Sequence, residues 1–180
     1  MSTLPLRIGL LVVLYISFGV SLFESVPMLP DRVATHFDAA GAANGWMTRS
    51  THLVFMSVFG LVFPLFLIGV CWSIRFLPAG LVNIPHREYW LADERRSETA
   101  SYLVRHAVWF ACLAIGFVIG LHWLIVLSNQ RQPPQLLIVW VLGVVGPFLV
   151  GVAVWVICLY RRFRIEGQAN DTMPPSAVVN

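Results

Sequence analysis

The sequence is poor in charged residues and contains no lysine. Only 12% of its 180 residues are charged, and all twelve basic residues are arginine. Soluble domains carry about 25% charged residues, whereas 58% of this chain is hydrophobic and its mean hydropathy is +0.76. These values exclude an ordinary soluble globular protein. At about 20 apolar residues per membrane-spanning helix, the chain has room for about four spans and for no separate catalytic domain.

The common enzyme signatures are also missing. The sequence has no G-x-S-x-G, no H-E-x-x-H, no glycine-rich phosphate loop and no C-x-x-C. Its three cysteines fall in separate apolar runs, which predicts small buried residues and no disulfide framework. A net charge of +3 is typical of arginines that anchor a chain at a membrane surface. We therefore expect a non-enzymatic protein whose partner is the lipid bilayer and not a nucleic acid.

Four long apolar runs predict transmembrane helices at about 6–29, 53–77, 106–128 and 136–160. The expected fold class is an all-α membrane protein, a four-transmembrane-helix bundle forming one domain over residues 1–164. The polar tail 165–180 is expected to be disordered. Pro64 and the pair Gly146-Pro147 predict kinks in the second and fourth spans. A cleaved secretory signal is the alternative for the first run, although no A-x-A cleavage site follows it.

The distribution of arginine predicts the orientation of these spans. Nine of the twelve arginines fall on one side of the apolar runs, and three fall on the other, namely Arg32, Arg49 and Arg131. Short loops rich in arginine stay in the cytoplasm. The expected location is therefore a bacterial inner membrane, with both termini and the second loop cytoplasmic and the first and third loops outside.

The first loop, residues 30–51, is the stretch richest in chemically active side chains. Val33, Thr35 and Phe37 alternate with other residues as a short strand requires. Gly41 and Asn44-Gly45 supply turn positions that tolerate positive φ. We therefore expect a short structured extracytoplasmic loop lying on the ends of the helices.

The first loop and the residue before it contain the run Leu29 to Asp38, followed by Gly41, Gly45-Trp46 and Arg49. Together these residues resemble the signature of a bacterial membrane family named domain of unknown function 1648. A second stretch, Asn83 to Ala92 with Arg95-Arg96, is similar to a motif in four-span members of that family. The family includes a membrane immunity protein that protects cells from a peptide toxin and sequesters a transcriptional repressor. The resemblance thus adds an immunity-like role to the alternatives and supplies no catalytic residues. The density of motifs in the two loops, together with the missing enzyme signatures, favours a non-enzymatic binding or sensing protein.

Two sets of candidate binding residues follow from these motifs. The outer set comprises Pro30, Thr35, His36, Phe37, Asp38, Gly41 and Trp46. The cytoplasmic set comprises Asn83, Pro85, Tyr89, Trp90 and Arg95. The charge pattern predicts that the third helix begins near Asp93 and extends about three turns beyond the bilayer. The segment 83–105 is either such a solvated extension or a docking surface for a cytoplasmic partner.

Ionisable residues at membrane depth suggest a site, because they are costly there. Glu24 shares a helical face with Ser17 and Ser21, and this polar seam is expected to face the bundle interior. A divalent-metal site formed by Glu24, His36, Asp38 and His122, with His52 nearby, is one hypothesis. The alternative is that these residues make structural hydrogen bonds, since none has the local spacing of a metal motif.

Gly116 and Gly120 form a G-x-x-x-G pattern in the third span. Such a pattern lets two helix backbones approach closely. It predicts packing within the bundle or, alternatively, a homo-oligomer or a membrane protein partner. A structural accessory subunit of a larger membrane complex is therefore a third functional hypothesis, beside the binding protein and the metal-binding protein.

Overall fold

The computed structural model describes residues 4–164 and contains a short hairpin and four long apolar segments. In chain order the elements are α1 (Leu4–Ser25), β1 (Arg32–Phe37), β2 (Ala43–Thr48), α2 (Arg49–Ser57), α3 (Phe63–Ser73), α4 (Arg87–Trp90), α5 (Asp93–Asn129) and α6 (Ile138–Phe163). Four helical segments are long and apolar enough to cross a membrane. The predicted fold class is confirmed. The tail predicted to be disordered lies outside the described residues.

The observed spans differ from the predicted ones mainly at their ends. The second span begins at Arg49, four residues before the predicted position, and ends at Ser73. It begins there because the Thr48 side chain caps the helix by accepting a hydrogen bond from the Thr51 amide (3.1 Å). The third helix begins at Asp93, as the charge pattern predicts. The polar end of this helix therefore extends well beyond its apolar run.

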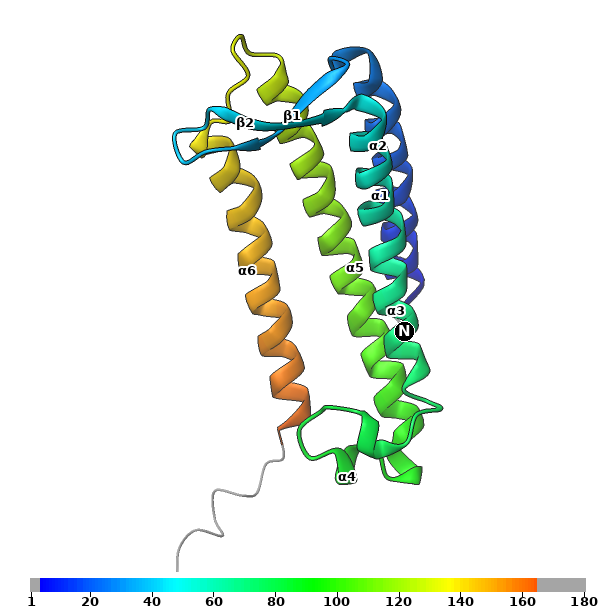
Figure 1. Ribbon diagram of the computed structural model, residues 1–180. Coiled ribbons are helices and arrows are strands. Elements are labelled where there is room, and N and C mark those ends of the chain that lie inside the picture. Colours follow the sequence, from blue (N-terminus) through cyan, green and yellow to red (C-terminus); the bar gives the residue numbers. More distant parts are fainter. Residues whose placement is uncertain (1–3, 165–180) are drawn as a thin grey trace, which may run out of the picture.

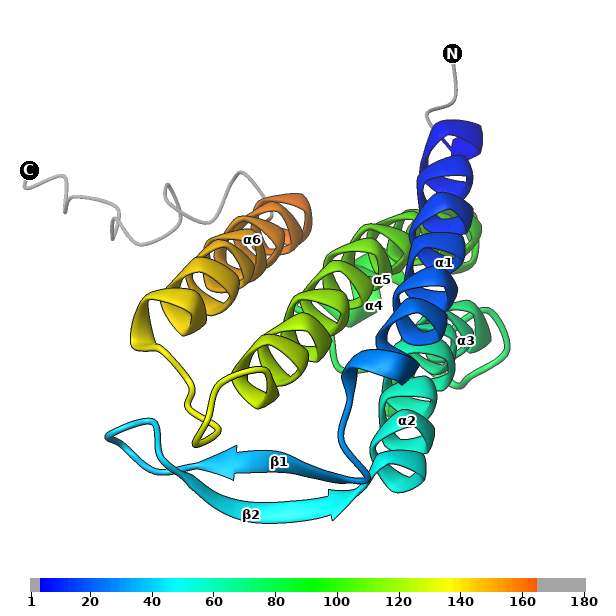
Figure 2. The ribbon, with the colours of Figure 1, turned by 90° about the horizontal axis from the view of Figure 1, so that it is seen from above.

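The long helix α5 lies between the other three long segments, and the four do not enclose one shared core. Figures 1 and 2 show α1 and the α2–α3 segment on one side of α5, and α6 on the other. The most apolar 18-residue stretch of α5 is 44% buried, whereas the corresponding stretch of α6 is 0% buried. The fourth helix therefore packs along α5 and leaves most of its apolar surface for lipid.

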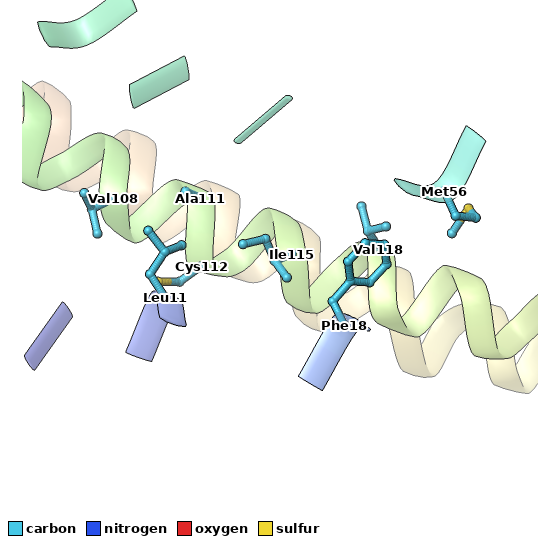
Figure 3. Close-up of a cluster of buried hydrophobic side chains, with 8 residues drawn as sticks. All are labelled: Leu11, Phe18, Met56, Val108, Ala111, Cys112, Ile115 and Val118. Atoms are coloured by element: carbon cyan, nitrogen blue, oxygen red, sulfur yellow. The ribbon is translucent and has the colours of Figure 1, made fainter. Parts of the chain in front are cut away.

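The main hydrophobic core lies between α1, α2 and α5 (Figure 3). Its buried members are Leu11, Phe18, Met56, Val108, Ala111, Cys112, Ile115 and Val118. Phe18 is fully buried and its ring lies against Gly60, where a Cβ atom would come within 2.3 Å of the ring. Gly60 is therefore required for the close approach of α1 to the second span.

The second span changes its helical geometry close to its proline. A π-helical turn, Val58–Val62, separates α2 from α3, and Pro64 stands at the start of α3. Proline cannot donate the backbone hydrogen bond expected at its position, and π turns are a recognised site of helix bending. In the fourth span, α6 continues as one helix through Pro147.

The glycines of the predicted G-x-x-x-G pattern have different surroundings. A Cβ atom on Gly120 would lie 2.7 Å from Val144 Cγ1 on α6, so this glycine lets α5 and α6 approach closely. Gly151 of α6 has an equivalent contact with Leu113 of α5 (2.7 Å). A Cβ atom on Gly116 would meet nothing within 4 Å. One half of the pattern thus serves packing within the chain, and the other half faces outward.

Candidate functional site

A β-hairpin covers one end of the helices and is the centre of the candidate site. β1 pairs with β2 in an antiparallel register that sets Val33 opposite Met47 and His36 opposite Gly45. The hairpin runs from the start of α2 towards the start of α6 (Figures 1 and 2). We call this the hairpin end of the molecule, and the opposite end, where α4 lies, the basic end. The structured loop predicted from the sequence is present.

The turn of the hairpin is built by Asp38 and Gly41. The Asp38 carboxylate accepts hydrogen bonds from the amides of Ala40 and Ala42, both at 2.9 Å. Gly41 has φ of 81°, and a Cβ atom there would lie 2.1 Å from the carbonyl oxygen of Leu136. Gly41 also accepts a hydrogen bond from the Leu136 amide (2.9 Å). Glycine is therefore required here by both conformation and space, as the sequence indicates.

The other predicted turn, at Asn44-Gly45, is wrong. Both residues lie inside β2, and Gly41 is the glycine with a positive φ among the described residues. The strand continues through this pair because Gly45 faces His36 across the hairpin at an irregular point in the register. The His36 Cβ atom lies 3.0 Å from the position of a Cβ on Gly45. The glycine accordingly makes room for an imidazole in place of a turn.

Asn129, the last residue of α5, fastens the hairpin to the helices. Its side-chain oxygen accepts a hydrogen bond from the Ala34 amide (2.8 Å), and its side-chain nitrogen donates to the Ala34 carbonyl (2.9 Å). The same nitrogen donates to the carbonyl of Ile125 (2.8 Å). Ala34 is fully buried, so one side chain satisfies both of its backbone groups.

A buried chain of hydrogen bonds lies beneath the hairpin and joins three elements. His52 of α2 is 2% exposed, and His122 of α5 and Ser25 of α1 are fully buried. His52 Nε2 lies 3.3 Å from His122 Nδ1, and His122 Nε2 lies 2.7 Å from Ser25 Oγ. The two imidazole rings are stacked at a centroid distance of 5.3 Å. Side chains from all of the first three spans thus meet in one polar group.

The donor and the acceptor of each hydrogen bond in the series Ser25, His122 and His52 can be assigned by starting from Ser25. The Ser25 hydroxyl donates to the carbonyl of Leu22 (2.9 Å), so its oxygen accepts from His122 Nε2–H. His122 Nδ1 then carries no proton and accepts from His52 Nε2–H. Two neutral imidazoles satisfy every bond in the chain. This group therefore stabilises the hairpin end of the bundle without needing a charge or a metal.

Beside this chain, an open cavity of about 440 Å³ lies under the hairpin. β1, β2, α2, α5 and the start of α6 form its walls, which are mainly apolar. Its polar lining includes His36, His52 and Thr35. Thr35 Oγ1 is buried and has no hydrogen-bond partner within residues 4–164. The wall of the cavity therefore contains one exposed imidazole and, beneath its surface, one buried hydroxyl without a partner among the described residues.

The predicted outer-loop residues divide into three groups in the structure. Those lining the cavity are Thr35, His36 and Phe37, and those building the turn are Asp38 and Gly41. Pro30 and Trp46 are exposed and lie outside the cavity lining. The sequence motif therefore contains both residues that line the cavity and residues that hold the turn of the hairpin in shape.

The structure does not bring the four predicted metal ligands together. His122 is bonded to His52 and Ser25, Asp38 is bonded to its own turn, and Glu24 is exposed. Within residues 4–164 there is no group of three or more His, Cys, Asp or Glu side chains that could hold a metal ion. The geometry therefore gives the metal hypothesis no support.

The polar face of α1 that packs against the bundle is not the one predicted from Ser17, Ser21 and Glu24. Glu24 and Ser17 are exposed, whereas Ser21 and Ser25 are buried. Ser21 accepts a hydrogen bond from the indole of Trp123 (3.3 Å), and Ser25 bonds His122. The two serines, four residues apart, face α5 because they lie one helical turn apart on the same face. Glu24 points away from the bundle.

At the basic end, several residues of the second predicted motif hold the chain together. The Trp90 indole donates to the carbonyl of Phe163 at the end of α6 (3.2 Å), and Thr99 donates to the Trp90 carbonyl (2.8 Å). The Arg95 guanidinium lies 3.9 Å from the centre of the Tyr89 ring and donates to the Tyr89 carbonyl (2.9 Å). Asn83 lines a neighbouring cavity, and Pro85 precedes α4. The contacts of Tyr89, Trp90 and Arg95 favour a structural role for this motif.

Sequence reasoning missed the roles of Ser25 and Asn129. Each is a polar residue at the end of an apolar run, where it is easily interpreted as a helix boundary. The sequence does indicate that such a residue, if it is buried, must form a hydrogen bond with another group of the protein. Because the partners lie about a hundred residues away along the chain, the sequence does not identify them.

Comparison with known proteins gives one result. Residues 12–61 match the model of a family described as Domain of unknown function (DUF1648). The DUF1648 region covers most of α1, the whole hairpin and α2, and so includes Ser25, Thr35, His36 and His52. No curated protein and no solved structure matches the chain. His122 and Asn129, which complete the site, lie outside the matched region.

Proposed function

We propose that this multi-pass membrane protein is a bacterial inner-membrane protein with both termini in the cytoplasm. The support is the distribution of arginine: nine lie towards the basic end, and Arg32, Arg49 and Arg131 lie towards the hairpin end. Translocation of arginine across a membrane is disfavoured in short loops. The basic end is then cytoplasmic, and the hairpin faces outward.

Within this orientation, we propose that the protein is a non-enzymatic receptor that binds an apolar peptide segment at the hairpin end. The observation that carries this proposal is the cavity of about 440 Å³ beneath the hairpin, with the unpartnered hydroxyl of Thr35 in its wall. Ligand sites are typically apolar hollows with a few polar groups that fix orientation. The cavity is large enough for one or two amino-acid side chains.

The polar groups favour a peptide over a lipid tail as the ligand. The imidazole of His36, and Thr35 Oγ1 once its side chain rotates towards the cavity, can each hydrogen-bond a backbone amide, and a hydrocarbon chain has no group to pair with them. The walls of the cavity are held in place by Asn129 and by the bonded pair His52 and His122. A preformed site of this kind loses little free energy to ordering when a ligand binds.

The test is a selection of short random peptides by display against the full-length protein in lipid nanodiscs. Val141 lines the cavity, and V141W fills it. Leu142, the next residue, is 63% exposed outside the lining, so L142W is the matched control. We expect peptides with apolar side chains to be enriched on the native protein and on L142W, and to be lost on V141W.

The contribution of Thr35 gives a second measurement on any selected peptide. Removing one hydrogen bond of this kind costs about 1 kcal/mol, so T35V is expected to weaken binding about fivefold, while T35S keeps the hydroxyl and the affinity. If no peptide is enriched, or if V141W retains the selected peptides as well as L142W does, the protein is not a peptide receptor at this cavity.

A further inference from the structure

A second cavity, at the basic end, combines an apolar floor with two arginines. It has a volume of about 610 Å³ and lies between α5 and α6, with the first turns of α1 at one side. Leu113, Gly151 and Val154 are among the residues of its floor, and Arg7 and Arg105 are among those of its rim. This groove is separate from the cavity under the hairpin and shares no lining residue with it.

The two arginines carry charge that no acidic residue balances within residues 4–164. The ion pairs there are Arg49 with Asp31, Arg87 with Glu88, and Arg162 with Glu98. Arg7 instead lies over the ring of Trp109 (5.4 Å) and donates one hydrogen bond to the carbonyl of Arg105 (3.4 Å). Its Nε is buried and has no hydrogen-bond partner among residues 4–164. A buried guanidinium donor without a partner is costly, and an anion that draws the Arg7 side chain into the groove would relieve that cost.

The positions of Arg7 and Arg105 along their helices correspond to the surface of a bilayer. From Arg7 to Met28 the first span covers 22 residues, a rise of about 32 Å at 1.5 Å per residue. This is close to the thickness of the hydrocarbon core of a bilayer, about 30 Å. The uncharged run of α5 between Arg105 and Asn129 has a similar length. Arg7 and Arg105 therefore lie where phospholipid phosphates lie, and the groove extends from them into the apolar layer.

One wall of the groove is held rigid by paired polar groups. The Trp155 indole donates to the carbonyl of His106 (2.9 Å), and His106 Nε2 donates to the carbonyl of Trp155 (3.0 Å). Their rings are stacked at 4.5 Å. Because these groups satisfy one another, they are not available to a ligand. Among the charged groups that line the groove, the two arginines then remain available to a ligand.

We propose that this groove binds an anionic phospholipid of the surrounding bilayer. Arg7 and Arg105 hold the phosphodiester, and one acyl chain lies on the groove surface formed by Leu113, Gly151 and Val154, where α5 and α6 meet. A lipid with net negative charge is favoured over a zwitterionic one, because the ammonium group of the latter would lie beside two uncompensated guanidinium groups. A bound acyl chain also covers apolar surface that α6 leaves open to the side.

The experiment is native mass spectrometry of the delipidated full-length protein with phosphatidylglycerol or phosphatidylethanolamine of identical chains. We expect phosphatidylglycerol to bind more tightly. R7Q and R105Q should each weaken its binding about fivefold, the loss expected for one arginine at an anionic surface. V154W, which fills the groove without changing charge, should also weaken it. Circular dichroism shows whether each variant keeps its helices, and V154W tests the groove independently if an arginine variant is unfolded.

The matched control is R161Q, since Arg161 is exposed at the same end and does not line the groove. It should keep the affinity for phosphatidylglycerol. Equal binding of the two lipids overturns the proposal, as does an equal loss in R161Q, which would show general surface attraction. Competition by inorganic phosphate as effective as that by lipid would show a phosphate site without an acyl groove and would also overturn it.

Discussion

Replacing Asn129 with alanine tests whether one side chain holds the hairpin on the helices. The substitution removes the acceptor of the Ala34 amide and the donor to the Ala34 carbonyl, and Ala34 is fully buried. A buried backbone group left without a partner costs about 1–3 kcal/mol. Water at the hairpin end recovers part of this loss, so we expect the hairpin to open about 2–4 kcal/mol more easily.

Hydrogen–deuterium exchange of the protein in nanodiscs measures this opening. Since 1.4 kcal/mol corresponds to a factor of ten, amides of the hairpin should exchange roughly 30- to 700-fold faster in N129A. N129D keeps an acceptor for the Ala34 amide and loses the donor, so its exchange should fall between those of the native protein and N129A. The rest of the bundle should change little.

S128A provides the control for this experiment. Ser128, the neighbouring residue, is fully buried, and its hydroxyl donates to the carbonyl of Leu124 within its own helix (2.7 Å). Its removal should leave exchange in the hairpin unchanged. If N129A accelerates exchange in residues 32–48 no more than S128A does, the two bonds to Ala34 do not hold the hairpin, and the rigid cavity inferred above loses its basis.

Three further substitutions test the packing and the backbone. G60A is expected to lower the free energy of unfolding by about 1–3 kcal/mol through overpacking against Phe18, and adding F18L should restore part of it in thermal unfolding. T99V removes the hydroxyl that donates to the Trp90 carbonyl, so the same assay should show a loss of about 1–3 kcal/mol, whereas T99S should show little. His86 has a φ of 51°, a conformation that costs residues other than glycine about 1 kcal/mol, so H86G should raise the melting temperature and H86A should not.

The sequence predicts the spans well because their signal is local. An apolar run of about 20 residues is recognised without knowing its neighbours, and the start of α5 at Asp93 follows from charge spacing along one helix. The ends of spans depend on caps. Thr48 moved the second span four residues earlier, and such a hydroxyl is hard to tell from other polar loop residues.

The candidate site is less predictable because its contacts join distant parts of the chain. The alternation at Val33, Thr35 and Phe37 predicted a strand, but its partner strand was not predicted, since Asn44-Gly45 has the composition of a turn. The same limit applies to His122. Which residues contact His122 depends on how α1 and α2 are rotated about their own axes. In the structure this rotation places Ser25 and His52 next to His122 and leaves Glu24 exposed.

The distribution of unsatisfied polar atoms connects the two proposals. In residues 4–164, three buried side-chain atoms have no hydrogen-bond partner, namely Arg7 Nε, Thr35 Oγ1 and Arg49 Nε. By contrast, Ser21, Ser25, His52 and His122, which belong to the spans beneath the hairpin, all find hydrogen-bond partners within the protein. Two of the three lie in the walls of the two cavities. A membrane interior leaves no water to satisfy a polar group, so the fold pairs the polar groups of its spans internally. Arg7 Nε and Thr35 Oγ1 lie buried beside the two cavities, and a ligand reaches them once their side chains rotate towards it.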